Sequence, residues 1–146
     1  MNEPFALKPG DVVSYELEDY VVESQITYSS PRLSWTEWVL NAGETDQRVM
    51  VVLIGAQLHV GKPCFFEGQP GDQMIRVGGQ LFDLKAGGRA DTSIVYDTGV
   101  TSYDHAEFWH YRDAAGRLIA IRRGHLGEWA LDLGSADPAT LEVYGA

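Results

Sequence analysis

Basic residues are scarce in this sequence. Lysine and arginine total 11 against 21 aspartates and glutamates, which gives a formal net charge of −10. Binding to nucleic acid depends mainly on cations that neutralise phosphates, and anionic membrane surfaces attract the same side chains. The composition therefore argues against a nucleic-acid partner and against an anionic membrane. It suits a basic protein partner or a small cationic ligand.

Cysteine and long apolar runs are also nearly absent. Cys64 is the only cysteine, so no intrachain disulfide can form, which fits a reducing cytoplasm. Two phenylalanines follow Cys64, which favours packing over a reactive thiol. The longest apolar run, residues 49–54, is far shorter than the ~20 residues of a membrane-spanning helix. The first residues have no basic start and no apolar stretch of signal length. We therefore expect a cytoplasmic protein without direct membrane insertion.

Helical periodicity is missing as well. No window longer than about ten residues keeps apolar side chains at helical spacing. Short alternating or β-branched segments follow one another instead, with turn signals between nearly all of them. This pattern predicts an all-β fold, a mostly antiparallel sandwich or barrel of about eleven short strands. The length predicts a single β domain over residues 1–146.

Glycine and proline mark the expected turns. Gly78-Gly79 predicts a hairpin, and residues 86–89 predict another turn between two strands. Residues 48–54 are almost all apolar or β-branched, which predicts a strand buried on both faces. Near the end of the chain, Asp137 and Pro138 could begin a helical turn as its N-cap and first residue.

One stretch, Ser34–Leu40, has an echo at His105–Tyr111. An offset of 70 residues aligns Glu37 with Glu107 and Trp38 with Phe108. The echo predicts two similar meander halves, residues 7–60 and 73–144, joined by a connection rich in glycine and proline. The alternative is two unrelated meanders that share a β composition.

The echo also supplies the candidate site. Alternate residues of a strand share a face, so Trp38 and Phe108 as core anchors would leave both glutamates pointing away from that core. Two carboxylates beside aromatic rings suit a polar or cationic ligand. The alternative is a pair of solvated carboxylates that protect a strand surface from aggregation. The candidate ligand-binding residues are Trp35, Glu37, His105, Glu107 and Trp109.

The histidines do not form a metal motif in the sequence. His105 and His110 are five residues apart and so face opposite ways on a strand, which leaves His105 and Glu107 to converge. A metal site would need a distant His59 or His125, and neither HExxH nor GxSxG occurs. We therefore predict no catalytic residue, no metal and no cofactor. A metal-dependent hydrolase built on His105 and Glu107 is the least favoured alternative.

Three motifs carry a family resemblance. Gly10-Asp11-Val12-Val13, Tyr20-Val21-Val22 and Trp35-Thr36-Glu37-Trp38-x-Leu40 resemble a family of small bacterial domains, the domain of unknown function 4178. The match is best over residues 7–54. The resemblance implies a bacterial, cytoplasmic β domain with no established activity and no catalytic residues to carry over. It also implies an accessory role near membrane-stress or polyamine-related systems.

These observations favour a non-enzymatic binding or accessory module that acts through contacts with a protein partner. The missing catalytic constellation and the surplus of aromatic side chains support this prediction. The alternative is a protein that binds a small polar or cationic ligand in a pocket between the two halves.

Overall fold

The computed structural model describes residues 6–42, 48–124 and 127–144. The elements in these residues are β1 (Val12–Tyr15), β2 (Glu18–Ser29), β3 (Ser34–Asn41), β4 (Arg48–Ile54), β5 (Gln57–Cys64), β6 (Met74–Val77), β7 (Gln80–Tyr96), β8 (Thr101–Arg112), β9 (Leu118–Gly124), β10 (Gly127–Ala136), η1 (Pro138–Thr140) and β11 (Glu142–Tyr144). Neighbouring strands pair antiparallel. The predicted all-β, antiparallel fold is confirmed.

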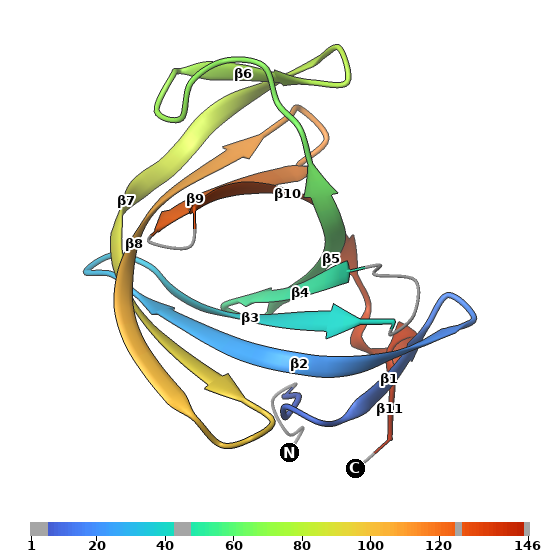
Figure 1. Ribbon diagram of the computed structural model, residues 1–146. Coiled ribbons are helices and arrows are strands. Elements are labelled where there is room, and N and C mark those ends of the chain that lie inside the picture. The colour runs from blue at the N-terminus through green and yellow to red at the C-terminus, as the bar shows by residue number, and fades with distance from the viewer. Residues whose placement is uncertain (1–5, 43–47, 125–126, 145–146) are drawn as a thin grey trace.

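The strands form one sheet that closes on itself (Figure 1). Its order is β11-β1-β2-β3-β4-β5-β10-β9-β8-β7-β6, and β2 also pairs with β7. Eight strands, β2 to β5 and β7 to β10, therefore make a closed, barrel-like ring. The sheet ends at β11 and β6, which have three and four residues. Edge strands this short offer little template for pairing with another chain.

The sheet contains two consecutive meanders, β1 to β5 and β6 to β10. They meet at the β5–β10 pairing and at the β2–β7 pairing. In each meander, the first strand lies outside the ring and the next four belong to it. Strands β3 and β8, which carry the echoed sequence, therefore hold the same position in the two meanders.

The offset of 70 residues does not superpose equivalent side chains of β3 and β8. Trp38 packs in a cluster outside the ring, whereas Phe108 packs inside it. The inward residues of β3 have odd numbers and those of β8 have even numbers, so equivalent positions differ by an odd offset. Trp38 and Phe108 are both buried, as predicted of core anchors, but they belong to different cores.

Both faces of the ring wall carry buried apolar side chains. One cluster fills the interior and includes Tyr28, Trp35, Met50, Val52 and Phe108. Outside β2 to β5, a second cluster includes Leu7, Val13 and Leu141 from the covering segments. A third lies outside β8 to β10, under β6 and the start of β7. Strand β4 contributes to the first two clusters, which confirms the strand buried on both faces.

Strand β2 changes face in the middle. Tyr20 and Val22 pack in the cluster outside the ring, but Ile26 and Tyr28 pack inside it. All four positions are even, so a regular strand would place them on one face. The pairing with β3 shifts register between Val22 and Ser24. This β-bulge, with Glu23 as the extra residue, reverses the direction of the following side chains.

The turn predicted at residues 86–89 is wrong. Strand β7 runs without interruption through 17 residues and pairs with β8 from Asp83 to Val95, with a register shift between Leu84 and Ala86. Here glycine allows a side chain of the neighbouring strand to approach the backbone closely, and it does not form a turn. A Cβ atom on Gly87 would lie 3.0 Å from Cδ1 of Trp109 and 3.3 Å from the carbonyl oxygen of Phe108. The glycine makes room for the indole ring on the outside of the wall.

Substitution of Gly87 by alanine is expected to lower the free energy of unfolding by about 1–3 kcal/mol, because the added methyl group overlaps Trp109. Gly134→Ala is the matched control, since no atom lies within 4 Å of its Cβ position on β10. Its stability is expected to stay level or rise by up to about 1 kcal/mol. Urea denaturation of both variants measures the difference, and equal stability would contradict the packing argument.

The described helical element is one short turn near the C-terminal end. Asp137 caps η1, and its side chain accepts a hydrogen bond from the backbone N–H of Ala139 at 3.0 Å. Pro138 follows at the first helical position, so the predicted helical turn is confirmed. In the described part of the chain, no helix has the length and apolar character needed to cross a membrane.

Candidate functional site

A buried ion pair crosses the interior of the ring. Glu37 on β3 and Arg122 on β9 are both 0% exposed. Arg122 donates to Oε1 of Glu37 from Nε at 2.8 Å and from Nη2 at 2.6 Å, and Trp35 Nε1 donates to the same oxygen at 3.0 Å. The expectation that Glu37 points away from the core is therefore wrong. Its face of β3 points into the ring, which has a core of its own.

Aromatic rings surround the Arg122 guanidinium. Tyr28 and Trp35 stack at 4.7 Å between ring centroids, with 8° between their planes. The guanidinium carbon lies 5.1 Å from the centre of the Tyr28 ring and 4.7 Å from that of Trp35. Phe108 meets Trp35 edge-on at 4.8 Å. Burial, followed by the Glu37 charge, raises the pKa of the Tyr28 hydroxyl, which keeps it protonated. The ion pair is thus fixed on several sides.

Two histidines share this interior. His110 Nε2 lies 2.9 Å from Nη1 of Arg122. A guanidinium can only donate, so this nitrogen accepts and the His110 ring is neutral. Burial and then Arg122 hold the pKa of His110 well below its usual range. Burial and then Arg112 lower the pKa of His59, which is 1% exposed and has no hydrogen-bond partner on either ring nitrogen.

A cavity of about 380 Å³ occupies one end of the ring. Every one of the eight ring strands contributes to its wall. Apolar and aromatic side chains predominate inside, and charged side chains stand among them. The lining residues are Glu23, Ser24, Ile26, Tyr28, Val39, Arg48, Met50, Pro63, Thr92, Ile94, Tyr96, Asp104, His105, Ala106, Gly124, Glu128, Trp129 and Leu131.

The ion pair lies one layer below this cavity. Val39 and Gly124 line the cavity, and each is two residues along its strand from Glu37 or Arg122, on the same face. Tyr28 belongs to both features, since it lines the cavity and contacts Arg122. The ion pair and its aromatic neighbours therefore form the floor of the cavity.

The five residues predicted from the sequence do not meet at one site. Trp35 and Glu37 lie together inside the ring. Glu107 faces outward, directly opposite Arg89 on β7 and Arg123 on β9. These residues and His105 line a separate hollow of about 450 Å³, and His105 also reaches the cavity wall.

Trp109, the fifth predicted residue, lies on the outside of the wall, where Arg123 covers its ring at 5.2 Å. Together, these positions place the two candidate glutamates on opposite faces of the wall. Glu37 and Glu107 therefore share no cavity.

The described residues contain no group of three or more His, Cys, Asp or Glu side chains able to hold a metal ion. His59 is buried inside the ring while Glu107 is exposed outside it, so these two do not converge. His125, the other partner considered, lies outside the described residues.

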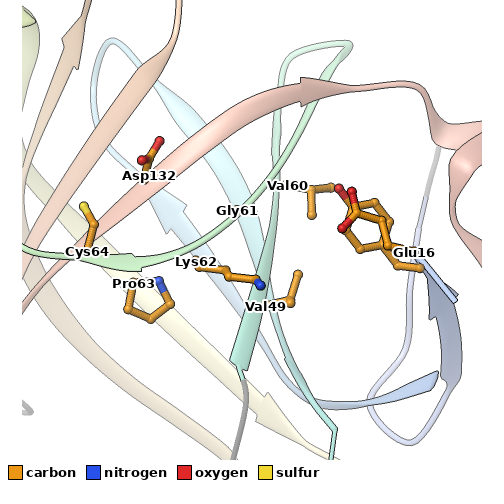
Figure 2. Close-up of a pocket in the computed structure, with 9 residues that line it drawn as sticks. Glu16, Val49, Val60, Gly61, Lys62, Pro63, Cys64 and Asp132 are labelled. Carbon is orange, nitrogen blue, oxygen red and sulfur yellow. The ribbon is translucent and has the colours of Figure 1, made fainter. Parts of the chain in front are cut away.

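Another hollow, of about 320 Å³, lies along β5 outside the interior site (Figure 2). Figure 2 shows Cys64 and Asp132 together at one end and Glu16 at the other, with Lys62 between them. Burial, then the Asp132 charge, raises the pKa of the Cys64 thiol to about 11. The thiol is thus a poor nucleophile at neutral pH, which agrees with a packing role.

Sequence reasoning missed the central residue, Arg122. A signal for it exists: residues 118–121 are Leu-Ile-Ala-Ile, and two arginines follow directly. Neighbouring residues of a strand face opposite ways, so one of these arginines must enter the face that Leu118 and Ala120 bury. An arginine on a buried face requires a carboxylate partner, and Glu37 is that partner.

The fold and the cavity define a class of protein: a small barrel-like ring of eight β-strands with a cavity at one end, and a buried ion pair beneath that cavity. The chain belongs to a family described as a domain of unknown function (DUF4178), which matches residues 8–136. The resemblance seen in the three N-terminal motifs is confirmed by this match. Neither a curated protein nor a solved structure matches the chain.

Proposed function

We propose that the protein binds a small, largely apolar ligand in the cavity at the open end of the ring. The observation that carries this proposal is the cavity wall, to which all eight ring strands contribute. Binding sites for small molecules commonly have volumes of about 300–1,000 Å³ and combine apolar walls with a few polar groups. The 380 Å³ cavity has this size and this composition.

The wall favours an occupant that is apolar over much of its length. Ile26, Val39, Met50, Ile94 and Leu131 supply aliphatic surface from five different strands. Burial of a ligand against them removes apolar area from water at about 25 cal/mol per Å². The strands hold these side chains in place before binding, so little ordering opposes association. Residues of both halves contribute, as the small-ligand alternative requires.

The accessory module that acts through a protein partner stays a prediction, and so does the absence of enzymatic activity. The cavity favours the small-ligand alternative, because contacts between protein surfaces do not require a hollow ring end. In this proposal, binding in the cavity is the primary activity, and any contact of the ligand-bound domain with a protein partner is secondary to it.

Neutral fluorescent N-phenyl-1-naphthylamine tests the proposal. We expect it to bind the wild-type protein with increased emission, and Val39→Trp to weaken this binding at least about tenfold by filling the cavity. Val143→Trp is the matched control, because Val143 is 43% exposed on β11, an edge strand that lies outside the ring. Equal binding by both variants, with circular dichroism confirming that both are folded, would contradict the proposed site. Absence of binding to the wild type would also count against it.

A further inference from the structure

We propose that the cavity selects ligands with a positively charged head, and that Glu23 holds this charge. The inference rests on the proposed function, since it names the chemical class of the ligand in that same cavity. A cationic amphiphile, with an ammonium group attached to an apolar chain, is the ligand that the wall fits. The evidence comes from the position, the burial and the neighbours of Glu23.

Glu23 is aimed by the β-bulge of β2. The register shift lies between Val22 and Ser24, so Glu23 has no paired residue on β3. Both Glu23 and Ser24 line the cavity, although neighbours on a regular strand would face opposite ways. Bulges occur next to binding sites because they redirect a side chain in this way. The irregularity therefore adds a carboxylate to a wall that would otherwise present only Ser24 here.

The Glu23 carboxylate lacks a full set of partners. Its Oε2 atom is buried and accepts no hydrogen bond. A charged oxygen withdrawn from water without a partner costs free energy, and a bound donor removes that cost. An ammonium group supplies both the opposite charge and N–H donors, and a quaternary ammonium supplies the charge alone. Glu23 therefore has an unmet requirement that a cationic ligand satisfies.

The other carboxylates of the cavity already have partners. Asp104 accepts a hydrogen bond from the backbone N–H of His105 at 2.8 Å. Glu128 accepts two hydrogen bonds from Arg123, at 3.0 and 2.8 Å. These carboxylates still add negative potential at the cavity, against one exposed arginine, Arg48. The balance of lining charge thus favours a cation over an anion.

Aromatic rings in the wall suit the same head group. Tyr28, Tyr96 and Trp129 line the cavity with Glu23. The faces of aromatic rings attract ammonium groups, most strongly where water is excluded. A carboxylate combined with aromatic rings is a general solution for binding alkylated ammonium ions.

Three amphiphiles that share one chain test the charge preference. Octyltrimethylammonium, octyl sulfate and octanol are titrated into the wild-type protein, and displacement of N-phenyl-1-naphthylamine gives their affinities. We expect the cation to bind at least about tenfold more tightly than the neutral and the anionic compounds. Tighter binding of octyl sulfate, which Arg48 would favour, overturns the inference, and so does equal binding of all three. Both of these results leave the proposed cavity intact, whereas no binding by any compound rejects the proposed function itself.

The variant Glu23→Gln removes the charge and keeps the size of the side chain. We expect it to weaken binding of octyltrimethylammonium at least about tenfold and to leave the affinity for octanol within about twofold. Glu107→Gln is the matched control, because Glu107 is exposed on the outside of the wall. An unchanged affinity for the cation in Glu23→Gln overturns the role of Glu23. The octanol affinity shows in the same experiment that the variant retains a folded cavity.

Discussion

Replacement of Arg122 by methionine is expected to lower the free energy of unfolding by about 3–5 kcal/mol. The variant leaves the Glu37 carboxylate at 0% exposure inside the ring without its ion-pair partner. Of the three hydrogen bonds described for Oε1 of Glu37, the one from Trp35 Nε1 would remain. A single indole N–H does not compensate a buried charge, so the protein must unfold more easily or admit water to its interior.

The double variant Glu37→Leu, Arg122→Met separates loss of the pair from loss of packing. Removal of both charges leaves no buried ion, and apolar side chains of similar size fill the space. We expect the double variant to recover most of the stability lost in Arg122→Met, with a remaining deficit because Trp35 Nε1 and His110 Nε2 lose their partners. Chemical denaturation of the two single variants and the double variant gives the coupling energy directly.

Arg123→Met is the control for the first prediction. Arg123 is the next residue of the same strand, and it also pairs with a glutamate, Glu128, at 2.8 Å. That pair is exposed, and such pairs contribute about 0–1 kcal/mol. Contact with the Trp109 ring adds about 0.5–1 kcal/mol. A loss in Arg122→Met no larger than that in Arg123→Met would contradict a structural role for the buried pair.

The contrast between these two arginines also shows where sequence reasoning succeeds and where it stops. Strand alternation correctly separates Trp35, Glu37 and Val39 from Trp38 and Leu40 on β3. Alternation says which side chains share a face, but it does not say which face is covered. Here both faces are covered, because segments outside the ring pack on its wall. The assumption of one core therefore assigned Glu37 to the wrong environment.

The β-bulge of β2 and the close approach at Gly87 could not be predicted from the sequence, for a different physical reason. A β-bulge is a local rearrangement of pairing, and no residue type in 22–24 announces it. The close approach at Gly87 depends on Trp109, a residue of the neighbouring strand. Glycine in a sequence permits a turn, and it equally permits contact with a bulky ring. The general fold was predictable because it follows from local patterns, whereas the cavity depends on how distant strands close the ring.

Acidification from pH 7.5 to 5.5 is expected to destabilise the protein through His59 and His110. Each imidazole takes up a proton near pH 6.5 in the unfolded chain, but burial lowers both pKa values in the folded chain. Below about pH 6.5 the unfolded state therefore binds more protons, so stability rises with pH and falls on acidification. This contribution is complete above the unfolded pKa and decreases by up to about 1.4 kcal/mol per pH unit for each histidine. Urea denaturation at several pH values measures the slope.

Variants separate the contribution of the interior histidines to this slope from that of other groups that titrate in acid. His59→Leu removes two ring nitrogens that have no partner, so we expect stability at pH 7.5 to be kept or raised and the slope to decrease. Leu58→Val is the control, because this buried neighbour of His59 on β5 carries no titratable group, so its replacement should leave the slope unchanged. Equal slopes in the wild type and both variants would contradict the assignment of His59.

A protonated His110 would also place two cations in contact, since Arg122 Nη1 lies 2.9 Å from its Nε2. Acid therefore acts on the floor of the cavity itself, and ligand affinity should decline together with stability.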